Sequence, residues 1–414
     1  MGGTTTTTDA TSALDIRADF PILGRIIDGR PIVYLDSGAT SQKPESVIAA
    51  MDDYYRCHNA NIHRSVYTLA QEATDLFEGA RERIAAFTGA ETTGTIFTRN
   101  ATEAINLVAY SWARANLGPG DAVLITEMEH HSNIVPWQLA TAETGAELRY
   151  LDVSDDGTLS LDQLDTELAR GDVRLIAVAH VSNVLGTINP VAEIIERAHR
   201  AGVLTLIDGS QAVPGMPVDV GELDADFYVW TGHKVLGPTG IGVLHGRTSL
   251  LKEMRPFLSG GDMISHVDLQ RSTWNDLPWK FEAGTSMIAE AVGLGAAVDY
   301  LSALGMGRVR EHEHALTQHA LTGLATVPGV RVVGPAQRAG IVSFVIDGMH
   351  PHDIAELVNR DNVCIRAGHH CAQPLMRRLG VGATARASFG PYNVASDVDA
   401  LVASLRGARD VFEL

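Results

Sequence analysis

The feature that most constrains the fold of this chain is an alternation of helical segments and short apolar runs between about residues 70 and 250. Residues 74–87 and 191–202 carry apolar side chains at helical spacing. The apolar runs of strand length are TIFT (95–98), AVLIT (122–126), RLIAVAHV (174–181), VLTLID (203–208), DFYVW (226–230) and GIGVL (240–244). Strands that alternate with helices are typical of parallel sheets, so we expect an α/β domain with a mostly parallel sheet.

A second, smaller domain is predicted downstream. A helical stretch rich in alanine and leucine (about 288–326) precedes two strand-like runs, IVSFVID and VCIRA, and two further helical segments, a pattern that indicates an α+β unit. Because a chain of 414 residues usually forms more than one domain, we expect a large domain over residues 16–290 and a small domain over 291–414. Residues 16–32 are expected to pack on the small domain. The polar, threonine-rich residues 1–15 are expected to be a disordered tail.

Charge and composition exclude several classes of partner. The formal net charge of −18 disfavours nucleic acids and anionic membranes, because both are bound through basic patches. No apolar run approaches the ~18 residues of a membrane-spanning helix. Three cysteines (Cys57, Cys364 and Cys371) are too few for a disulfide framework and favour a reducing compartment. The expected location is therefore cytoplasmic, with no nucleic-acid or membrane partner.

One aspartate and one lysine indicate a possible chemistry. Only four of the 32 basic residues are lysines, and arginine cannot supply a deprotonated amine. Asp208 ends one apolar run, and Lys234 follows the next one beside a glycine-rich turn. A lysine among dry strands suits Schiff-base chemistry, and a buried aspartate suits the pyridine nitrogen of pyridoxal 5′-phosphate. The alternative interpretation is a strand-end aspartate and a surface lysine with no shared role.

Polar groups follow three further apolar runs. In TRNATEAIN (98–106) the backbone N–H groups of Ala101 and Thr102 open a helix, as in phosphate sites, although an ordinary helix cap has the same pattern. In TEMEHHSNIVPW the pair His130 and His131 is compatible with metal ligands, a base or a ring stacked on a cofactor. Asn183 follows another strand. Because parallel strands present their carboxyl ends at one edge, we expect these groups to share one crevice.

The loop RAGHHCAQPL (366–375) has three possible interpretations: a zinc site, half of a disulfide, or a loop that offers a reactive thiol. Zinc ligands are normally spaced apart, whereas His369, His370 and Cys371 are consecutive. A disulfide to Cys364 is disfavoured in a reducing cell. The spacing of these residues does not by itself decide among the three.

Taken together, the motifs resemble those of a known family. MEHHSNIVPW, HVSNVLGT, IDGSQAVPG, TGHKVLGPTGIGVL, FEAGT and RAGHHCAQPL resemble the cysteine desulfurases of the class V aminotransferase family, and the SUF-type (SufS-like) group in particular, from about Tyr34 to the C-terminus. The resemblance implies a fold-type-I pyridoxal-phosphate-dependent α/β fold, with a mostly parallel seven-stranded sheet and a smaller α+β C-terminal domain. It implies conversion of L-cysteine to L-alanine, leaving a persulfide on Cys371. A selenocysteine lyase, or a protein of this fold without turnover, is the alternative.

The resemblance also implies roles for individual residues. Lys234 would bind the cofactor covalently and then move the substrate Cα proton, and Asp208 would keep the ring nitrogen protonated. His130 would stack on the ring and assist proton transfer, and Gln211 would bond the ring hydroxyl. The implied phosphate ligands are Ala101, Thr102, Thr231, His233 and Thr285 of the partner subunit. The implied substrate-binding residues are Asn183, Arg366 and Arg386, and the implied nucleophile is Cys371, where the loop would offer its thiol.

The same resemblance implies partners. DGMHPHDIAE (347–356) resembles a stretch of SUF desulfurases that act with a zinc-containing SufU-type sulfur acceptor in iron–sulfur cluster assembly. His352 would there take over a ligand position on the zinc of the acceptor, since neutral imidazole is a competent zinc ligand. The alternative is a histidine at a helix start with no metal role. A homodimer is expected, and no metal of the chain's own.

Overall fold

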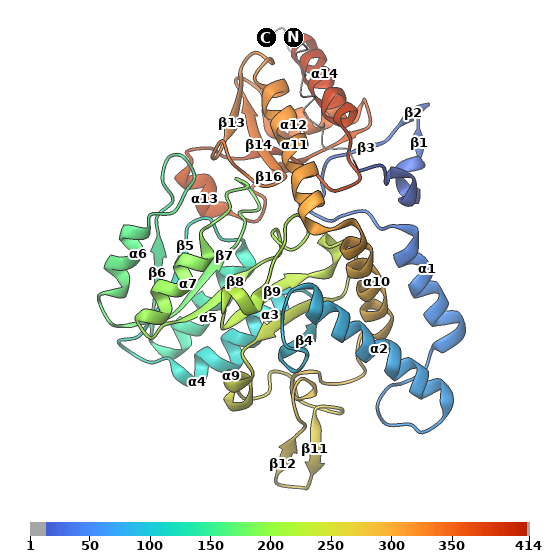
Figure 1. Cartoon of the computed structure of the whole chain (residues 1–414). Helices are drawn as coiled ribbons and strands as arrows, with labels where there is room; N and C mark the ends of the chain where they lie inside the picture. The colour runs from blue at the N-terminus through green and yellow to red at the C-terminus, as the bar shows by residue number, and fades with distance from the viewer. Residues whose placement is uncertain (1–13, 412–414) are drawn as a thin grey trace, which may run out of the picture.

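The computed structural model describes residues 14–411 and is built around a seven-stranded sheet (Figure 1). The strand order is β4-β10-β9-β8-β7-β5-β6, and all neighbours are parallel except the pairs that β10 makes with β4 and β9. The strands span Thr95–Thr98 (β4), Ala122–Thr126 (β5), Glu147–Leu151 (β6), Val173–Ala179 (β7), Leu204–Asp208 (β8), Phe227–Thr231 (β9) and Gly242–Gly246 (β10). The predicted mostly parallel seven-stranded sheet is confirmed.

One strand of this sheet, β6, is absent from the apolar runs that the sequence presents. It lies at the edge of the sheet, and only Leu151 at its end is buried. An edge strand has one neighbour and keeps exposed polar side chains, so its sequence ELRYL carries no continuous apolar run. The hydrophobic pattern therefore indicated the other six strands of the sheet and missed β6.

Helices cover both faces of the sheet, because alternate residues of each strand point to opposite sides. Ile207 packs with α2 (Thr68–Phe87) and α10 (Ile288–Leu304), whereas the adjacent Leu206 packs in a separate apolar cluster with α3 and α5. The remaining helices of this domain are α1 (Glu45–Asp53), α3 (Ala101–Val108), α4 (Arg114–Asn116), α5 (Val135–Thr144), α6 (Leu161–Leu168), α7 (Val191–Arg200), α8 (Val220–Leu223) and α9 (Thr248–Glu253). Burial on both faces explains why the central strands are apolar throughout.

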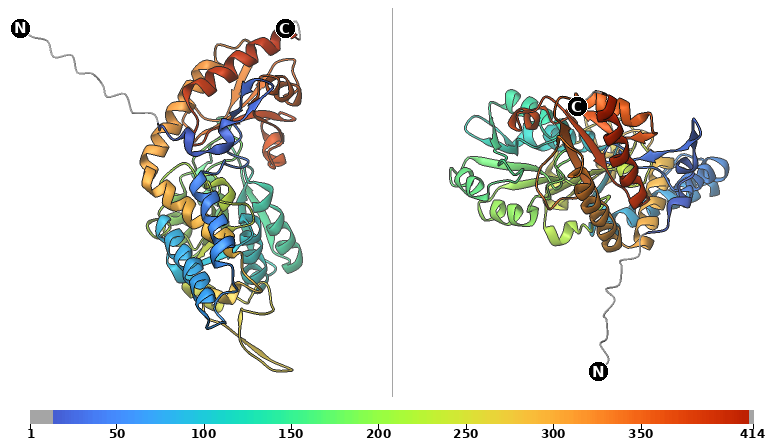
Figure 2. Two further views of the ribbon diagram at one scale, coloured as in Figure 1. Left: turned by 90° about the vertical axis from the view of Figure 1, so that its right-hand side faces the viewer. Right: turned by 90° about the horizontal axis from the view of Figure 1, so that it is seen from above.

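The small domain is an antiparallel sheet in the order β13-β14-β17-β16, packed with α11, α12 and α14, and Figure 2 shows it at one end of the large domain. Its elements are α11 (Met306–Leu324), β13 (Val330–Val333), β14 (Ile341–Ile346), α12 (Pro351–Asn359), β15 (Val363–Cys364), β16 (Arg366–Gly368), α13 (Gln373–Arg378), β17 (Thr384–Ser388) and α14 (Ala395–Val411). The short hairpins are β1 (Ile26–Ile27) with β2 (Arg30–Pro31), and β11 (Ile264–Val267) with β12 (Ser272–Trp274).

The N-terminal segment is joined to the small domain. β3 (Val33–Tyr34) pairs in parallel with β15, and Arg17 forms an ion pair of 3.0 Å with Asp397 on α14. Leu14 is 3 % exposed and packs in the core. The predicted disordered tail of residues 1–15 therefore wrongly included Leu14. The rest of that predicted tail, residues 1–13, lies outside the described residues.

The change from one domain to the other occurs at Gly305. The predicted boundary after residue 290 falls inside α10, whose apolar residues belong to the core of the large domain. The chain bends by 78° between α10 and α11, and Gly305 stands at the break with φ +82°, a conformation that favours glycine. The run of alanine and leucine in the sequence continues across this bend and therefore hides it.

No single helix in the described part of the chain is both long and apolar enough to cross a membrane, and only the bent pair of α10 and α11 meets that test jointly.

A buried carboxyl group lies between the two domains. Glu313 on α11 is 6 % exposed and lines an interdomain cavity together with Arg310. Its carboxylate approaches the backbone so closely that a Cβ at Gly215 would lie 2.4 Å from Glu313 Oε2. Burial raises the pKa of Glu313 to about 8, and the charge of Arg310 opposes this only in part.

We predict that Glu313→Gln stabilises the protein at pH 8. The unfolded carboxyl loses its proton near its ordinary pKa of 4.5, whereas the folded one keeps it up to about 8. The native protein therefore loses stability as the pH rises between these values, and the neutral amide does not. The expected gain in the free energy of unfolding is ~4 kcal/mol at pH 8 and close to zero at pH 4. Denaturant titrations at both pH values measure it, with the exposed Glu311→Gln as control; equal gains at the two pH values would contradict the assignment.

Candidate active site

The carboxyl ends of the parallel strands open into one cleft, which residues of the small domain also line. β4 runs in the same direction as β9, since both are antiparallel to β10. The cleft has a volume of ≈ 780 Å³, including its part open to solvent. The predicted site residues that line it are Ala101, Thr102, His130, Asn183, Asp208, Gln211, Thr231, His233, Lys234, Arg366, Cys371 and Arg386. Thr285 and His352 do not line it, and both are exposed.

Lys234 and Asp208 lie at the ends of two neighbouring strands of the sheet, β9 and β8. Asp208 ends β8, and Lys234 closes a short 3₁₀ turn that directly follows β9. The Asp208 carboxylate is 7 % exposed and accepts a hydrogen bond of 3.0 Å from the backbone N–H of Ser210. Burial lowers the pKa of Lys234 to about 8, with Asp208 opposing the shift and Arg386 adding to it. A lysine with this pKa supplies a substantial fraction of neutral amine near neutral pH, as nucleophilic and proton-transfer roles require.

The start of α3 forms one end of the cleft. Asn100 caps the helix by accepting a 3.0 Å bond from the N–H of Glu103, which leaves the first N–H groups directed to the cleft. β10 passes so close that a Cβ at Gly242 would lie 2.5 Å from the Cα of Asn100. Thr102 Oγ1 contacts the hydroxyl of Ser132 at 2.6 Å. Helix N–H groups and hydroxyls together make an anion site at this end.

His130 follows β5 and is a neutral ring. Burial and the charge of Lys234 lower the pKa of His130 to about 3. Its Nδ1 accepts the backbone N–H of Ser132 at 3.1 Å, so the ring proton is assigned to Nε2. The preceding Glu129 is fully buried and anchors this turn, since its carboxylate accepts bonds from Asn133 Nδ2 (2.6 Å) and the N–H of Ala179 (3.0 Å).

Arg386 on β17 reaches into the cleft from the small domain. Its side chain is 2 % exposed, donating to the carbonyl of Asn183 at 2.8 Å and pairing with Asp36 at 3.1 Å. Its Nε atom is buried without a hydrogen-bond partner. The fork of this guanidinium suits a planar carboxylate, which would also satisfy the unpaired Nε.

Cys371 lies in the turn between β16 and α13, and this turn is tied to the large domain. The carbonyl of Cys371 accepts a 2.7 Å bond from the N–H of His131, and the carbonyl of His370 accepts a 2.6 Å bond from Asn183 Nδ2. Cys57, Cys364 and Cys371 are all free thiols. Among the side chains that the structure describes, no three of His, Cys, Asp or Glu are grouped as a metal site would require.

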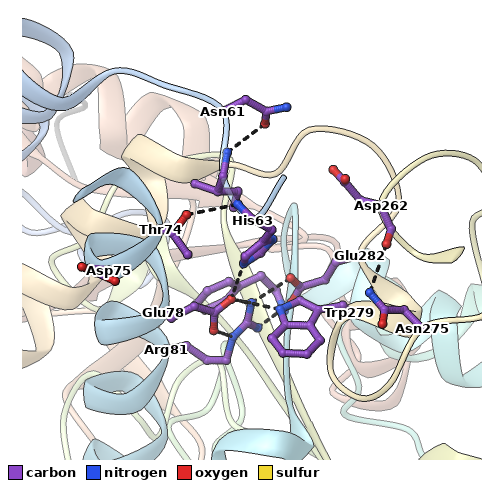
Figure 3. A network of polar contacts seen from close by, with 12 residues as sticks. Asn61, His63, Thr74, Asp75, Glu78, Arg81, Asp262, Asn275, Trp279 and Glu282 are labelled. Carbon is purple, nitrogen blue, oxygen red and sulfur yellow. Dashed lines mark hydrogen bonds and ion pairs between the residues drawn. The ribbon is translucent and has the colours of Figure 1, made fainter. Parts of the chain in front are cut away.

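The segment that carries Thr285 is fixed by a buried ion pair (Figure 3). Arg81 on α2 is fully buried and pairs in two-pronged fashion with Glu282, at 2.6 and 2.8 Å. Glu282 also accepts the backbone N–H of Phe97 at 2.7 Å. Glu78 joins the network through Arg81 and His63; burial would raise the pKa of Glu78, but these hydrogen bonds lower it to about 2.

We predict that Glu282→Ala destabilises the protein by about 3–5 kcal/mol, because it leaves the buried guanidinium of Arg81 without a counter-charge. Denaturant unfolding at neutral pH measures the change. The exposed Glu253→Ala on α9 serves as control and is expected to shift the free energy of unfolding by less than about 0.5 kcal/mol. A loss below about 1 kcal/mol for Glu282→Ala would contradict a paired, desolvated arrangement.

Several residues around the cleft were not predicted from the sequence. The carbonyl of His233, next to Lys234, accepts bonds from Thr40 Oγ1 (3.1 Å), Ser41 Oγ (3.0 Å) and Lys43 Nζ (2.9 Å). Lys43 is one of the four lysines of the chain, and burial lowers its pKa to about 8. The scarcity of lysine was a signal for Lys43, whereas nothing in the sequence connects residues 40–43 to a turn 190 positions away.

Comparison with known proteins identifies the family of this chain. The aminotransferase class-V family model matches residues 33–401. The chain belongs to the class-V aminotransferase family. It is 53 % identical to a probable cysteine desulfurase of Halalkalibacterium halodurans, covering 97 % of this chain and 99 % of that one, and 48 % identical to a cysteine desulfurase of Haloferax volcanii, covering 96 % and 97 %. The crystal structure of the cysteine desulfurase CsdA from Escherichia coli matches with a TM-score of 0.89 at 40 % identity, covering 96 % and 98 %.

This class-V aminotransferase is a cysteine desulfurase, and its cofactor is pyridoxal 5′-phosphate. The residues of the cleft fit that cofactor. Thr231 Oγ1 and Ser210 Oγ are buried, line the cleft and have no hydrogen-bond partner, so a bound group with acceptor oxygens would satisfy them. When bound, the cofactor withdraws electrons from the substrate carbon that carries the amino group.

Proposed function

We propose that this cysteine desulfurase takes sulfur from L-cysteine onto Cys371. The observation that carries the proposal is that Cys371 lines the same cleft as Lys234 and Arg386, although its loop belongs to the small domain. The resemblance to cysteine desulfurases of known structure supports the same assignment. The relatives reported above are named cysteine desulfurases, so selenocysteine lyase activity is the disfavoured alternative.

In the proposed arrangement each residue has a defined task. Lys234 would attach the cofactor and would take the substrate Cα proton through its amine of lowered pKa. Asp208 would accept a hydrogen bond from the ring nitrogen, Gln211 would bond the ring hydroxyl and neutral His130 would lie against the ring. Ala101, Thr102, Thr231 and His233 would hold the phosphate. The substrate carboxylate is held by Arg386, with Asn183 and Arg366 nearby.

The transfer step balances without an outside oxidant. The Cys371 thiolate attacks the substrate sulfur, a sulfur–sulfur bond forms and the substrate carbon–sulfur bond breaks. The electron pair of the broken bond stays with the three-carbon fragment, which takes up protons and leaves as L-alanine. Sulfur remains on Cys371 as a persulfide.

A peptide mass analysis tests this function. The holoenzyme is exposed briefly to L-cysteine and digested, and the peptides of the three cysteines are compared. One added sulfur on the Cys371 peptide alone, with alanine released, is the expected result. Alanine release with Cys371 unmodified and with sulfur on Cys57 or Cys364 would refute the assignment of the nucleophile.

We further propose that the acceptor is a zinc-containing, SufU-type protein of iron–sulfur cluster assembly, and that the enzyme is of the SUF type. His352 is exposed at the start of α12, and its ring stacks on that of His350 with centroids 5.1 Å apart. The ring of His350 accepts the N–H of His352 and so caps the helix, which leaves the ring of His352 available for a metal held by another protein.

We predict that His352→Ala leaves persulfide formation unchanged and slows sulfur transfer to a zinc-containing acceptor by roughly tenfold or more, since even the loss of a hydrogen-bond partner of a metal ligand has an effect of this size. Transfer of labelled sulfur from the persulfide to the acceptor measures this. The exposed His319→Ala on α11 is the matched control. If transfer by His352→Ala equals that of the control, the ligand role of His352 is wrong.

We also propose a cytoplasmic homodimer in which Thr285 reaches the phosphate site of the partner. The exposed Val66 and Leu269 (104 % and 92 %) lie on two segments that the Arg64–Asp262 ion pair joins at 2.8 Å. The residue before Thr285, Gly284, bonds Gly261 beside this pair. This apolar surface around Thr285 supports association with a second copy, and the three free thiols support a reducing compartment. Light scattering of the purified holoenzyme tests the dimer.

A further inference from the structure

His131 is a residue of the cleft region to which no role has been assigned so far. It belongs to the large domain and follows His130, and its carbonyl accepts the N–H of Ile134, yet its own N–H and its ring both contact the Cys371 turn of the small domain. Its backbone N–H donates to the carbonyl of Cys371 at 2.7 Å, and its ring Nε2 accepts the N–H of Gln373 at 3.1 Å. The two partner residues, Cys371 and Gln373, therefore flank Ala372, where the turn ends and the next helix begins.

The Cys371 turn needs support from outside itself. His370 and Cys371 both have left-handed backbone conformations, with φ values of +51° and +56°, and neither is a glycine. Two consecutive non-glycine residues in this region are unfavourable and persist only where the surroundings hold them. The turn is therefore not in the conformation that its own residues prefer.

The helix after the turn also lacks a cap of its own. α13 begins at Gln373, and the preceding Ala372 has no side chain that can accept a hydrogen bond. The first N–H groups of a helix have no partner within the helix. The ring of His131 supplies the missing acceptor for Gln373 from another domain. The N–H of Gln373 points at Nε2, so the ring proton of His131 is assigned to Nδ1. Burial lowers the pKa of His131, and the neighbouring His369 lowers it further, which favours the neutral ring.

We propose that His131 is a positioning residue that holds the Cys371 turn against the large domain, so that the thiol stays directed to the substrate sulfur. Asn183 assists through its bond to the carbonyl of His370. This inference rests on the proposed role of Cys371 as nucleophile.

Two substitutions separate the acceptor function of the ring from its volume. His131→Phe keeps a ring of similar size but cannot accept the N–H of Gln373, whereas His131→Gln keeps an acceptor oxygen at a similar reach. The control is His369→Ala, an exposed histidine of the same turn whose ring makes no hydrogen bond in the structure. All variants are tested as the cofactor-loaded enzyme.

Two measurements are made on each variant. The first is hydrogen–deuterium exchange, resolved to the N–H of Gln373 within the peptide that contains residues 369–378 by fragmentation of that peptide. Loss of one hydrogen bond is expected to speed its exchange roughly three- to tenfold in His131→Phe. The second is persulfide formation in a single turnover, expected to slow roughly tenfold because the nucleophile is less well placed. Cofactor binding and the spectral change on adding L-cysteine should stay at wild-type values.

The expected set of results is faster exchange and slower persulfide formation in His131→Phe, restoration of both in His131→Gln, and wild-type exchange in His369→Ala. Unchanged exchange in His131→Phe would overturn the proposal, and so would failure of His131→Gln to restore it. The exchange measurement does not depend on the reaction. If Cys371 gains no sulfur in the wild-type enzyme while His131→Phe still speeds exchange, the proposed function fails and the contact stands.

Discussion

Replacing Lys234 with alanine is expected to lower the rate of alanine formation by roughly 10³-fold or more, since the variant loses both its covalent link to the cofactor and its proton-transferring amine. No other lysine lines the cleft in the described part of the chain. The visible absorption of the attached cofactor should disappear, and borohydride reduction should leave no cofactor on the peptide of residue 234.

The exposed Lys252→Ala on α9 is the control for this experiment and should retain the cofactor and full activity. Cofactor that stays covalently attached in Lys234→Ala, with turnover near the wild-type rate, would remove Lys234 from its proposed role. Cofactor that binds without a covalent link, with turnover lost, would support it.

The second large effect is expected for Cys371→Ala. This variant should bind the cofactor as the native enzyme does and still react with L-cysteine at the substrate carbon, because Lys234, Asp208 and Arg386 are unchanged. Sulfur transfer to an acceptor protein should fall by roughly 10²-fold or more, since no thiolate is left to take the sulfur. The measurement is labelled sulfur recovered on the acceptor.

The other two cysteines provide matched controls, as Cys57 is exposed and Cys364 lies in β15. Cys57→Ala and Cys364→Ala are expected to transfer sulfur at the native rate. Transfer by Cys371→Ala at the native rate, with acceptor present, would mean that sulfur passes to the acceptor without a persulfide on Cys371.

Hydrophobic pattern was sufficient to predict the architecture of the large domain. Its central strands are buried on both faces, so each appears in the sequence as a short apolar run that does not depend on distant partners. The hydrophobic pattern failed in two places: at a strand with few buried residues, and along two consecutive apolar helices. Edge strand β6 has too few buried residues to be recognised, and the apolar helices around Gly305 conceal the point where the chain turns into the small domain.

The sequence by itself determined which polar residues stand at the ends of strands and therefore reach the cleft. Asp208 and Lys234 each follow an apolar strand, and parallel strands of one sheet must present such residues at one edge. Cys371 was identified as the nucleophile only through resemblance to a family, because the spacing of its loop did not by itself decide among three interpretations. Family motifs likewise supplied the roles of Gln211, His233 and Arg386.

Only the tertiary structure decided which residues that are distant in the sequence meet. The bonds of His131 to Cys371 and Gln373, and of Lys43 to the carbonyl of His233, join positions at least 190 residues apart. No local preference encodes such pairs. The bonds of His131 depend on how the small domain packs on the large one, and the bond of Lys43 depends on how distant segments of the large domain meet. The sequence therefore determined the strands and the residue types at their ends, and the packing of the two domains determined how the thiol and the lysine are held.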